Sequence, residues 1–353
     1  MLNCMVTGGC GACVVLVSTY DPKLKKVEDF SVSPCLTLLC SLNGCSITTS
    51  EGLGNTRDGF HAIHERANLC RCTGNWPIAD ACKTFVADVD IEDLGINSFW
   101  EKGDSKKTKV SKLPPYDPTK NFSTYPEFLK SESTTNLDSS RYPWYSPVTI
   151  VELRSLLNSK VMENDASFKL VVGNTGSVHY KETQRYNHYV DIKHVPEPSI
   201  INGDQTGIEV GATVTIAKFI SFLNEESKIK FGSYGKLVSE KLAYHMEKIA
   251  SPFVRNSASI GGNLVMAQKN GFPSDIATLF LGLYATVSLM TIHGLENLTL
   301  EELLSRPLLD SRTVLLSVWI PFKKDQSSLQ THSRFCLIPI ELLHHLMGMH
   351  WHM

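Results

Sequence analysis

Two cysteine pairs near the start of the chain have the residue types and spacing of metal ligands. Cys10 and Cys13 form a C-x-x-C pair among glycines, and Cys70 and Cys72 form a C-R-C-T-G turn. Thiolates at such spacings bind iron–sulfur clusters, and small residues between them let backbone N–H groups point at the sulfurs. Plant-type [2Fe–2S] sites use C-x4-C-x2-C with a distant fourth cysteine, and Cys35 is a candidate for it. The pattern predicts iron–sulfur chemistry.

Both cysteine sets are incomplete. The ligand expected five residues before Cys10 falls on Met5, and Cys4 lies one residue out of register. No second C-x-x-C stands near the C-R-C turn to complete a four-cysteine site. Two alternatives stay open: reduced buried cysteines, and a zinc site from the same two pairs, which ranks lower because its C-x-C arm is atypical.

Two glycine-containing segments further along the chain could approach a phosphate group. The run KLVV at 169–172 predicts a buried strand, and Gly173-Asn174-Thr175-Gly176 predicts a tight turn after it. The segment 259–263, SIGGN, predicts a second turn of the same kind. Glycine permits positive φ and lets backbone N–H groups come close to a pyrophosphate. Neither segment is the G-x-G-x-x-G of dinucleotide-binding folds. A single glycine-containing turn is more often an ordinary turn between two elements than a binding site.

Length and composition indicate what class of protein must position these groups. The chain has 353 residues, 42% hydrophobic residues and a net charge of -2, which favours globular domains and argues against nucleic acid as the main partner. The N-terminus lacks a secretory signal, and the ten cysteines favour a cytoplasmic protein. The uncharged run 276–292 is short for a membrane span and predicts a buried helix that leads into a strand. We expect no membrane partner.

The chain divides into four parts by composition. Nine of the ten cysteines lie in residues 1–100, where strands are predicted at 13–18 and 45–49 and a helix at 78–85. Residues 101–140 are polar and predict a linker. Strand and helix patterns return at 141–325, and the tail 326–353 is dense in His, Met and Leu.

Several of these runs resemble one family. GGCGACVV, NLCRCTG, KLVVGNTG and SPFVRNSASIGGNLVMAQ are similar to the molybdo-flavoenzymes, the family of xanthine dehydrogenase and aldehyde oxidase. The sequences of these runs most resemble plant-type aldehyde oxidases that act on abscisic aldehyde or indole-3-acetaldehyde. The resemblance implies an α+β fold class. It comprises a partial ferredoxin-like β-grasp [2Fe–2S] domain at 1–60 and a remnant of the helical [2Fe–2S] domain at 61–100. After the linker, a vanillyl-alcohol-oxidase-type (PCMH-type) FAD-binding domain follows at 141–325.

The resemblance also implies cofactor contacts. By position, FAD would be bound by Lys169, Leu170, Val171, Val172, Gly173, Asn174, Thr175, Gly176, Ile249, Ser259, Ile260, Gly261, Gly262, Asn263, Asp275 and Leu315. The iron ligands would be Cys10, Cys13, Cys35, Cys70 and Cys72, with Cys4 a poor substitute for the first. The C-G-x-C segment of the second cluster and the molybdopterin domain have no counterpart in the sequence. We therefore expect a truncated chain with an internal deletion, one doubtful cluster and one incomplete cluster.

In the family, an aldehyde, water and oxygen give a carboxylate and hydrogen peroxide, with electrons passing through two [2Fe–2S] clusters to FAD. The resemblance thus predicts the FAD-binding and electron-transfer portion of an oxidoreductase that oxidises no aldehyde alone. Two alternatives are a non-catalytic fragment that docks on a full-length homologue and a stand-alone FAD oxidoreductase. Because a missing hairpin would leave an unpaired sheet edge, we expect the first hundred residues to be the least stable.

Overall fold

The structure is a computed structural model. It describes residues 11, 13–21, 25–49, 52, 54–55, 59–60, 125–130, 143–159, 168–176, 186–226 and 231–322. The predicted helix at 78–85 and the tail 326–353 lie outside the described residues, as do Cys4, Cys10, Cys70 and Cys72.

A small antiparallel sheet lies near the start of the chain, and we call it the N-terminal sheet. It has the order β2-β1-β3, built from β1 (Val15–Asp21), β2 (Lys26–Val32) and β3 (Ser46–Thr48). The strands predicted at 13–18 and 45–49 are confirmed as β1 and β3. The 3₁₀ helix η1 (Leu39–Leu42) precedes β3, and the two-residue strands β4 (Gly54–Asn55) and β5 (Gly59–Phe60) pair beyond it.

A short helix from the predicted linker packs on the N-terminal sheet. This is the 3₁₀ helix η4 (Glu127–Lys130). Just before it, Tyr125 stacks on Tyr20 of β1 with ring centroids 6.5 Å apart, and its hydroxyl donates to the Gly44 carbonyl at 2.8 Å. A polar composition did not prevent order here, because two tyrosines supply the contact.

A three-stranded parallel sheet follows, with the order β6-β8-β7. Its strands are β6 (Trp144–Tyr145), β7 (Phe168–Val171) and β8 (His188–Asp191). Helix α4 (Ile150–Leu157) buries Leu153 and Leu157, and Thr149 caps it by accepting from the Glu152 N–H. These residues form a hydrophobic cluster that also includes Met290 and Val314 of the next sheet, so the two sheets share a core.

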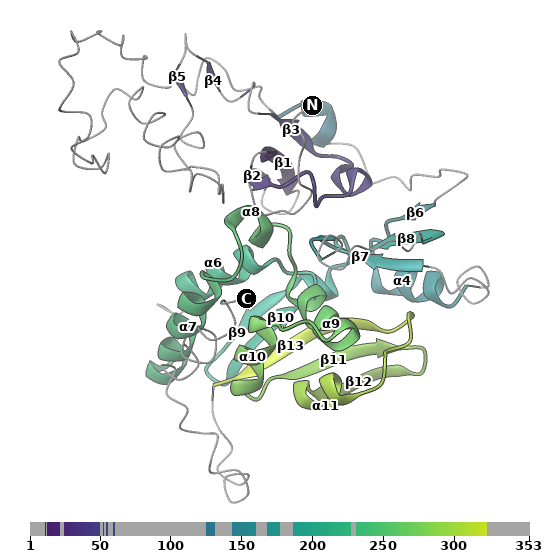
Figure 1. Cartoon of the computed structure of the whole chain (residues 1–353), viewed down its shortest axis with the longest axis vertical. Coiled ribbons are helices and arrows are strands. Elements are labelled where there is room, and N and C mark those ends of the chain that lie inside the picture. The colour runs from purple at the N-terminus through teal and green to yellow at the C-terminus, as the bar shows by residue number, and fades with distance from the viewer. Residues whose placement is uncertain are drawn as a thin grey trace, which may run out of the picture.

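The largest part is a five-stranded antiparallel sheet, β12-β11-β13-β10-β9, covered by helices (Figure 1). The strands are β9 (Ile201–Gly203), β10 (Gly207–Gly211), β11 (Thr286–Thr291), β12 (Gly294–Thr299) and β13 (Val314–Pro321), and the 3₁₀ helix η5 (Glu197–Ser199) leads into β9. The helices are α6 (Ile216–Glu226), α7 (Ser233–Met246), α8 (Pro252–Arg255), α9 (Ile260–Asn270), α10 (Asp275–Gly282) and α11 (Leu300–Ser305). The helix-to-strand prediction at 276–292 is confirmed by α10 and β11.

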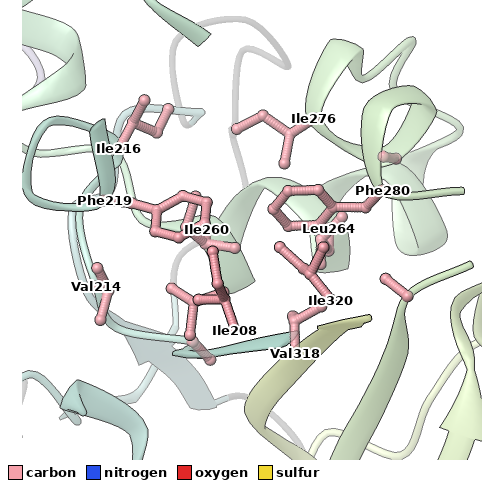
Figure 2. Packing of buried hydrophobic residues seen from close by; sticks show 14 of the residues in the cluster. Ile208, Val214, Ile216, Phe219, Ile260, Leu264, Ile276, Phe280, Val318 and Ile320 are labelled. Carbon is pink, nitrogen blue, oxygen red and sulfur yellow. The ribbon is translucent and has the colours of Figure 1, made fainter. Parts of the chain in front are cut away.

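Alternation along the central strands creates the main core. Ile208 of β10 lies opposite Ile320 of β13, and both are fully buried on the face that the helices cover. Figure 2 shows Phe219, Leu264 and Phe280, from α6, α9 and α10, meeting these strands. On the other face the Ser317 hydroxyl hydrogen-bonds the Glu209 carboxylate at 2.8 Å. This period-two pattern fixes the register of β13 between its neighbours.

None of the helices in the described part of the chain has the length and apolar character needed to cross a membrane.

Candidate functional site

A cavity of about 330 Å³ lies where the parallel sheet meets the five-stranded sheet. Its walls come from β7 and the loop after it, from the first turns of α9 and from the start of β13. Most of the residues for which the resemblance implies cofactor contact line it: Lys169, Leu170, Val171, Val172, Gly173, Asn174, Thr175, Gly176, Ser259, Gly261, Gly262, Asn263 and Leu315. Segments up to 146 positions apart in the chain thus enclose one space.

The loop after β7 touches the segment before α9 backbone to backbone. A Cβ added at Gly173 would lie 1.7 Å from the Ser257 carbonyl oxygen and 2.6 Å from its carbon. Glycine is needed at 173 for this close approach. The positive φ that the sequence suggested for a glycine of this turn belongs instead to Asn174, at 54°. Asparagine tolerates that conformation better than most residues, so the turn needs no second glycine there.

The segment 259–263 is the start of a helix, which differs from the predicted turn. Ser259 is the N-cap of α9, and its hydroxyl accepts from the Gly262 N–H at 3.1 Å. The N–H groups of Ile260 and Gly261 donate to the carbonyls of Val214 and Ala212, at 2.9 and 2.8 Å. The first-turn donors are therefore already used inside the protein. What this end of α9 offers a ligand is the positive end of its dipole.

Lys169 places a cation in the cavity wall. Its Nζ donates to Asn174 Oδ1 at 2.9 Å and lies 5.6 Å from the centre of the Tyr186 ring. The ammonium is thereby held beside the loop 173–176. Within the described part of the chain, no hydrogen bond uses the backbone N–H groups of Thr175 and Gly176. A cation beside a turn of N–H groups suits an anion such as a phosphate.

Three of the implied cofactor residues lie away from the cavity wall. Ile260 is fully buried in the main core, because each helical residue turns by about 100° and consecutive residues cannot all face one side. Ile249 lies in the turn after α7, where Arg255 Nη1 hydrogen-bonds its carbonyl oxygen at 3.0 Å. Asp275 is the first residue of α10, and burial raises the pKa of its carboxyl.

Ser274, just before Asp275, connects α10 to the cavity wall. Its hydroxyl hydrogen-bonds Asn263 Oδ1 and caps α10 by accepting from the Ala277 N–H at 2.9 Å. One serine thus fixes both the start of α10 and the side chain of a cavity residue.

The cavity wall contains further residues that sequence reasoning missed: Phe168, Tyr186, Ile192, Ala212, Ala258, Val265, Met266, Gln268, Lys269, Asn270, Leu309, Asp310, Ser311, Thr313 and Val314. Most come from the second half of α9 and from the loop before β13. Gln268 Nε2 ties the two together by donating to the Pro307 carbonyl at 2.9 Å. Only their position in the fold brings them to the cavity, since no local motif marks them.

The described residues do not include a complete ligand set for either predicted iron–sulfur site. Of the predicted ligands, Cys13 and Cys35 are described, and both are half-buried. Within the described ranges, no group of three or more His, Cys, Asp or Glu side chains could hold a metal ion. The remaining predicted ligands, Cys4, Cys10, Cys70 and Cys72, lie outside the described residues.

A cavity between two sheets, with a glycine loop, a helix N-terminus and a lysine in its wall, is a site suited to a phosphate-bearing cofactor. The chain belongs to the family described as FAD binding domain in molybdopterin dehydrogenase, whose match covers residues 136–323. The match includes the two sheets that enclose the cavity.

The most similar relatives include plant aldehyde oxidases, which confirms the resemblance drawn from the sequence. The chain is 47% identical over 366 residues to aldehyde oxidase 4 of Arabidopsis thaliana, a match that covers 89% of this chain and 27% of that protein. It is 46% identical over 362 residues to abscisic-aldehyde oxidase of the same plant, with the same coverage. The chain thus spans about a quarter of the length of these relatives.

The alignment with aldehyde oxidase 4 is longer than the part of this chain that it covers. That relative therefore carries residues within the matched span that this chain lacks. Among solved structures, carbon monoxide dehydrogenase from Hydrogenophaga pseudoflava is 21% identical, with a TM-score of 0.41 over 51% of this chain and 59% of that one.

Proposed function

We propose that this chain binds FAD in the cavity between its two sheets and is the flavin and electron-transfer portion of a molybdenum-dependent aldehyde oxidase. The observation that carries the proposal is the shared cavity. The loop 173–176 and the start of α9, which the family resemblance marks independently, enclose the same space. FAD, when bound, supplies the site with a two-electron carrier.

The residues of the cavity suit the parts of a flavin dinucleotide. Lys169 and the loop 173–176 provide a cation and backbone donors for a pyrophosphate. Leu170 and Leu315 provide apolar wall against which a ring system can exclude water. The close backbone contact at Gly173 holds the loop 173–176 against the segment before α9, which contributes Ser259 to the same cavity.

Fluorescence titration of the recombinant chain with FAD tests the proposal. We expect saturable quenching of flavin fluorescence at one FAD per chain. Lys169→Met should weaken FAD binding about tenfold, since it removes one charge-assisted contact. Lys236→Met is the matched control, because Lys236 is a half-exposed lysine on α7 that does not line the cavity. No saturation by FAD would overturn the proposal.

The electron-transfer part of the proposal has its own test. A complete [2Fe–2S] cluster adds two iron atoms and two sulfides per chain. Because both cysteine sets are incomplete in the sequence, we expect less than one cluster per chain, and we expect no aldehyde oxidation by the chain alone. Iron and acid-labile sulfide assays on freshly purified protein, with an aldehyde turnover assay beside them, measure both.

A further inference from the structure

Two contacts join the N-terminal segment to residues next to the cavity wall. Ile192 lines the cavity, and the next residue, Lys193, reaches the other way. Its Nζ donates to the Ser41 carbonyl of η1 and pairs with Asp191 Oδ2 at 3.5 Å. The tripeptide 191–193 thus has one side chain in the cavity wall and one on the N-terminal segment.

A second contact repeats this arrangement. Asn256 Nδ2 donates to the Ser31 carbonyl of β2 at 2.8 Å. The residues that follow Asn256 are Ser257, whose carbonyl meets Gly173, and Ala258 and Ser259, which line the cavity. The contact to β2 and the closest backbone contact of the cavity wall are therefore one residue apart.

Charge holds the first contact in place. Asp191 is 1% exposed, and its Oδ1 accepts from the Lys193 N–H at 3.1 Å. Burial raises the pKa of the Asp191 carboxyl, while the nearby Lys193 ammonium acts against that rise. A buried carboxylate needs its cation, so Lys193 cannot leave without a penalty. Lys193 is also near the half-buried Cys45 thiol, whose pKa burial raises.

A third contact lacks any connection to the cavity. Lys218 of α6 pairs with Glu28 of β2 at 3.3 Å, and both side chains are substantially exposed. Neither residue, nor any other residue of α6, lines the cavity. We call Lys193, Asn256 and Lys218 the docking surface.

We propose that the docking surface binds the N-terminal sheet in a manner linked to the cavity: a ligand in the cavity tightens docking, and docking tightens the ligand. The inference rests on the proposed FAD site. Lys193 and Asn256 are positioning residues that act through Ile192 and through 257–259. Docking restrains these two wall segments. A ligand that must order them therefore loses less conformational entropy on binding when the sheet is docked. Linkage then makes the effect reciprocal.

This inference changes the expectation for the start of the chain. The sequence suggested that the first hundred residues would be the least stable. With the cavity filled, we expect residues 26–48 to be protected along with the five-stranded sheet.

Hydrogen exchange measured by mass spectrometry on the full chain, with and without saturating FAD, tests the linkage. We expect FAD to slow exchange in peptides from 26–48. We expect Lys193→Met and Asn256→Ala each to remove that slowing and to weaken FAD binding about fivefold. Asn256→Ala leaves no buried charge behind, so it separates linkage from simple destabilisation. Lys218→Met is the control: it loses only an exposed ion pair to the same strand, which contributes little to docking, and it should bind FAD as the wild type does.

Alkylation gives an independent readout in the same segment. FAD should slow iodoacetamide modification of Cys45, which is half-buried, and leave that of the exposed Cys40 unchanged. FAD binding without any change at 26–48 or at Cys45 would overturn the linkage and leave the flavin site standing. Absence of FAD binding would overturn both.

Discussion

Replacing Gly173 by alanine should damage stability and cofactor binding together. The new Cβ would lie 1.7 Å from the Ser257 carbonyl oxygen, whereas unstrained contacts need about 3.4 Å. Both partners are backbone, so no side-chain rotation can relieve the clash and the two segments must separate by more than an ångström. Overpacking typically costs about 1–3 kcal/mol, and a backbone clash belongs at the upper end, at about 3 kcal/mol.

A loss of about 3 kcal/mol lowers Tm by about 6–12 °C in a domain of this size. The same separation moves Ser259 away from the loop 173–176, so FAD affinity should fall at least about tenfold, or about 1.4 kcal/mol. Thermal unfolding followed by circular dichroism and fluorescence titration with FAD measure the two effects.

The matched control is Gly282→Ala. Gly282 ends α10, and nothing lies within 4 Å of a Cβ added there. That variant should range from neutral to about 1 kcal/mol more stable, because alanine favours helix over glycine. A Gly173→Ala protein with wild-type Tm and FAD affinity would refute the contact between the two segments.

Three further predictions concern single side chains. Arg255→Ala should cost about 2 kcal/mol in urea unfolding, since one guanidinium nitrogen donates to three backbone carbonyls after α7; Arg255→Lys should recover part of it, and equal loss in both would contradict this reading. Thr299→Ala should cost about 1 kcal/mol by the same assay, because Thr299 and Glu302 form a capping box at α11; a neutral result would exclude that role. Burial holds the pKa of Asp191 above its ordinary 3.8, so the stability it contributes is complete below that pH and falls as pH rises through the folded-state pKa. Asp191→Asn should remove this decline, and parallel stability curves for variant and wild type would refute it.

The sequence marked the two segments that line the cavity, but not the physical reasons for their residues. Glycine at 173 suggested a left-handed turn, and the structure needs it for space, which depends on a neighbour 84 positions away. Likewise, SIGGN carries a serine N-cap signal, yet its glycines favoured a turn, and packing against Ala212 and Val214 made it a helix start. Local propensity is weak wherever tertiary contacts decide.

The rest of the cavity wall could not be predicted for a related reason. Tyr186, Met266 and Asp310 are ordinary residues in ordinary local patterns, and they meet only because two sheets share a core. The helix-to-strand passage at 276–292 was predictable, since an apolar run with a small-residue break is a local signal. The contact of Lys193 with η1 joins residues 152 positions apart, and no local sequence pattern predicts it.

Strand β13 has a consequence for how the protein is made. It lies in the middle of the five-stranded sheet, between the hairpins β9–β10 and β11–β12, and it is the last of the described strands in the chain. A ribosome delivers both hairpins before it delivers their common neighbour, so until Pro321 has emerged they remain separate and their apolar faces stay unmatched. Leu315, at the start of β13, also supplies cavity wall. The nascent chain therefore completes the cavity wall only when this strand is added, and the interval before that is when chaperones have most to protect.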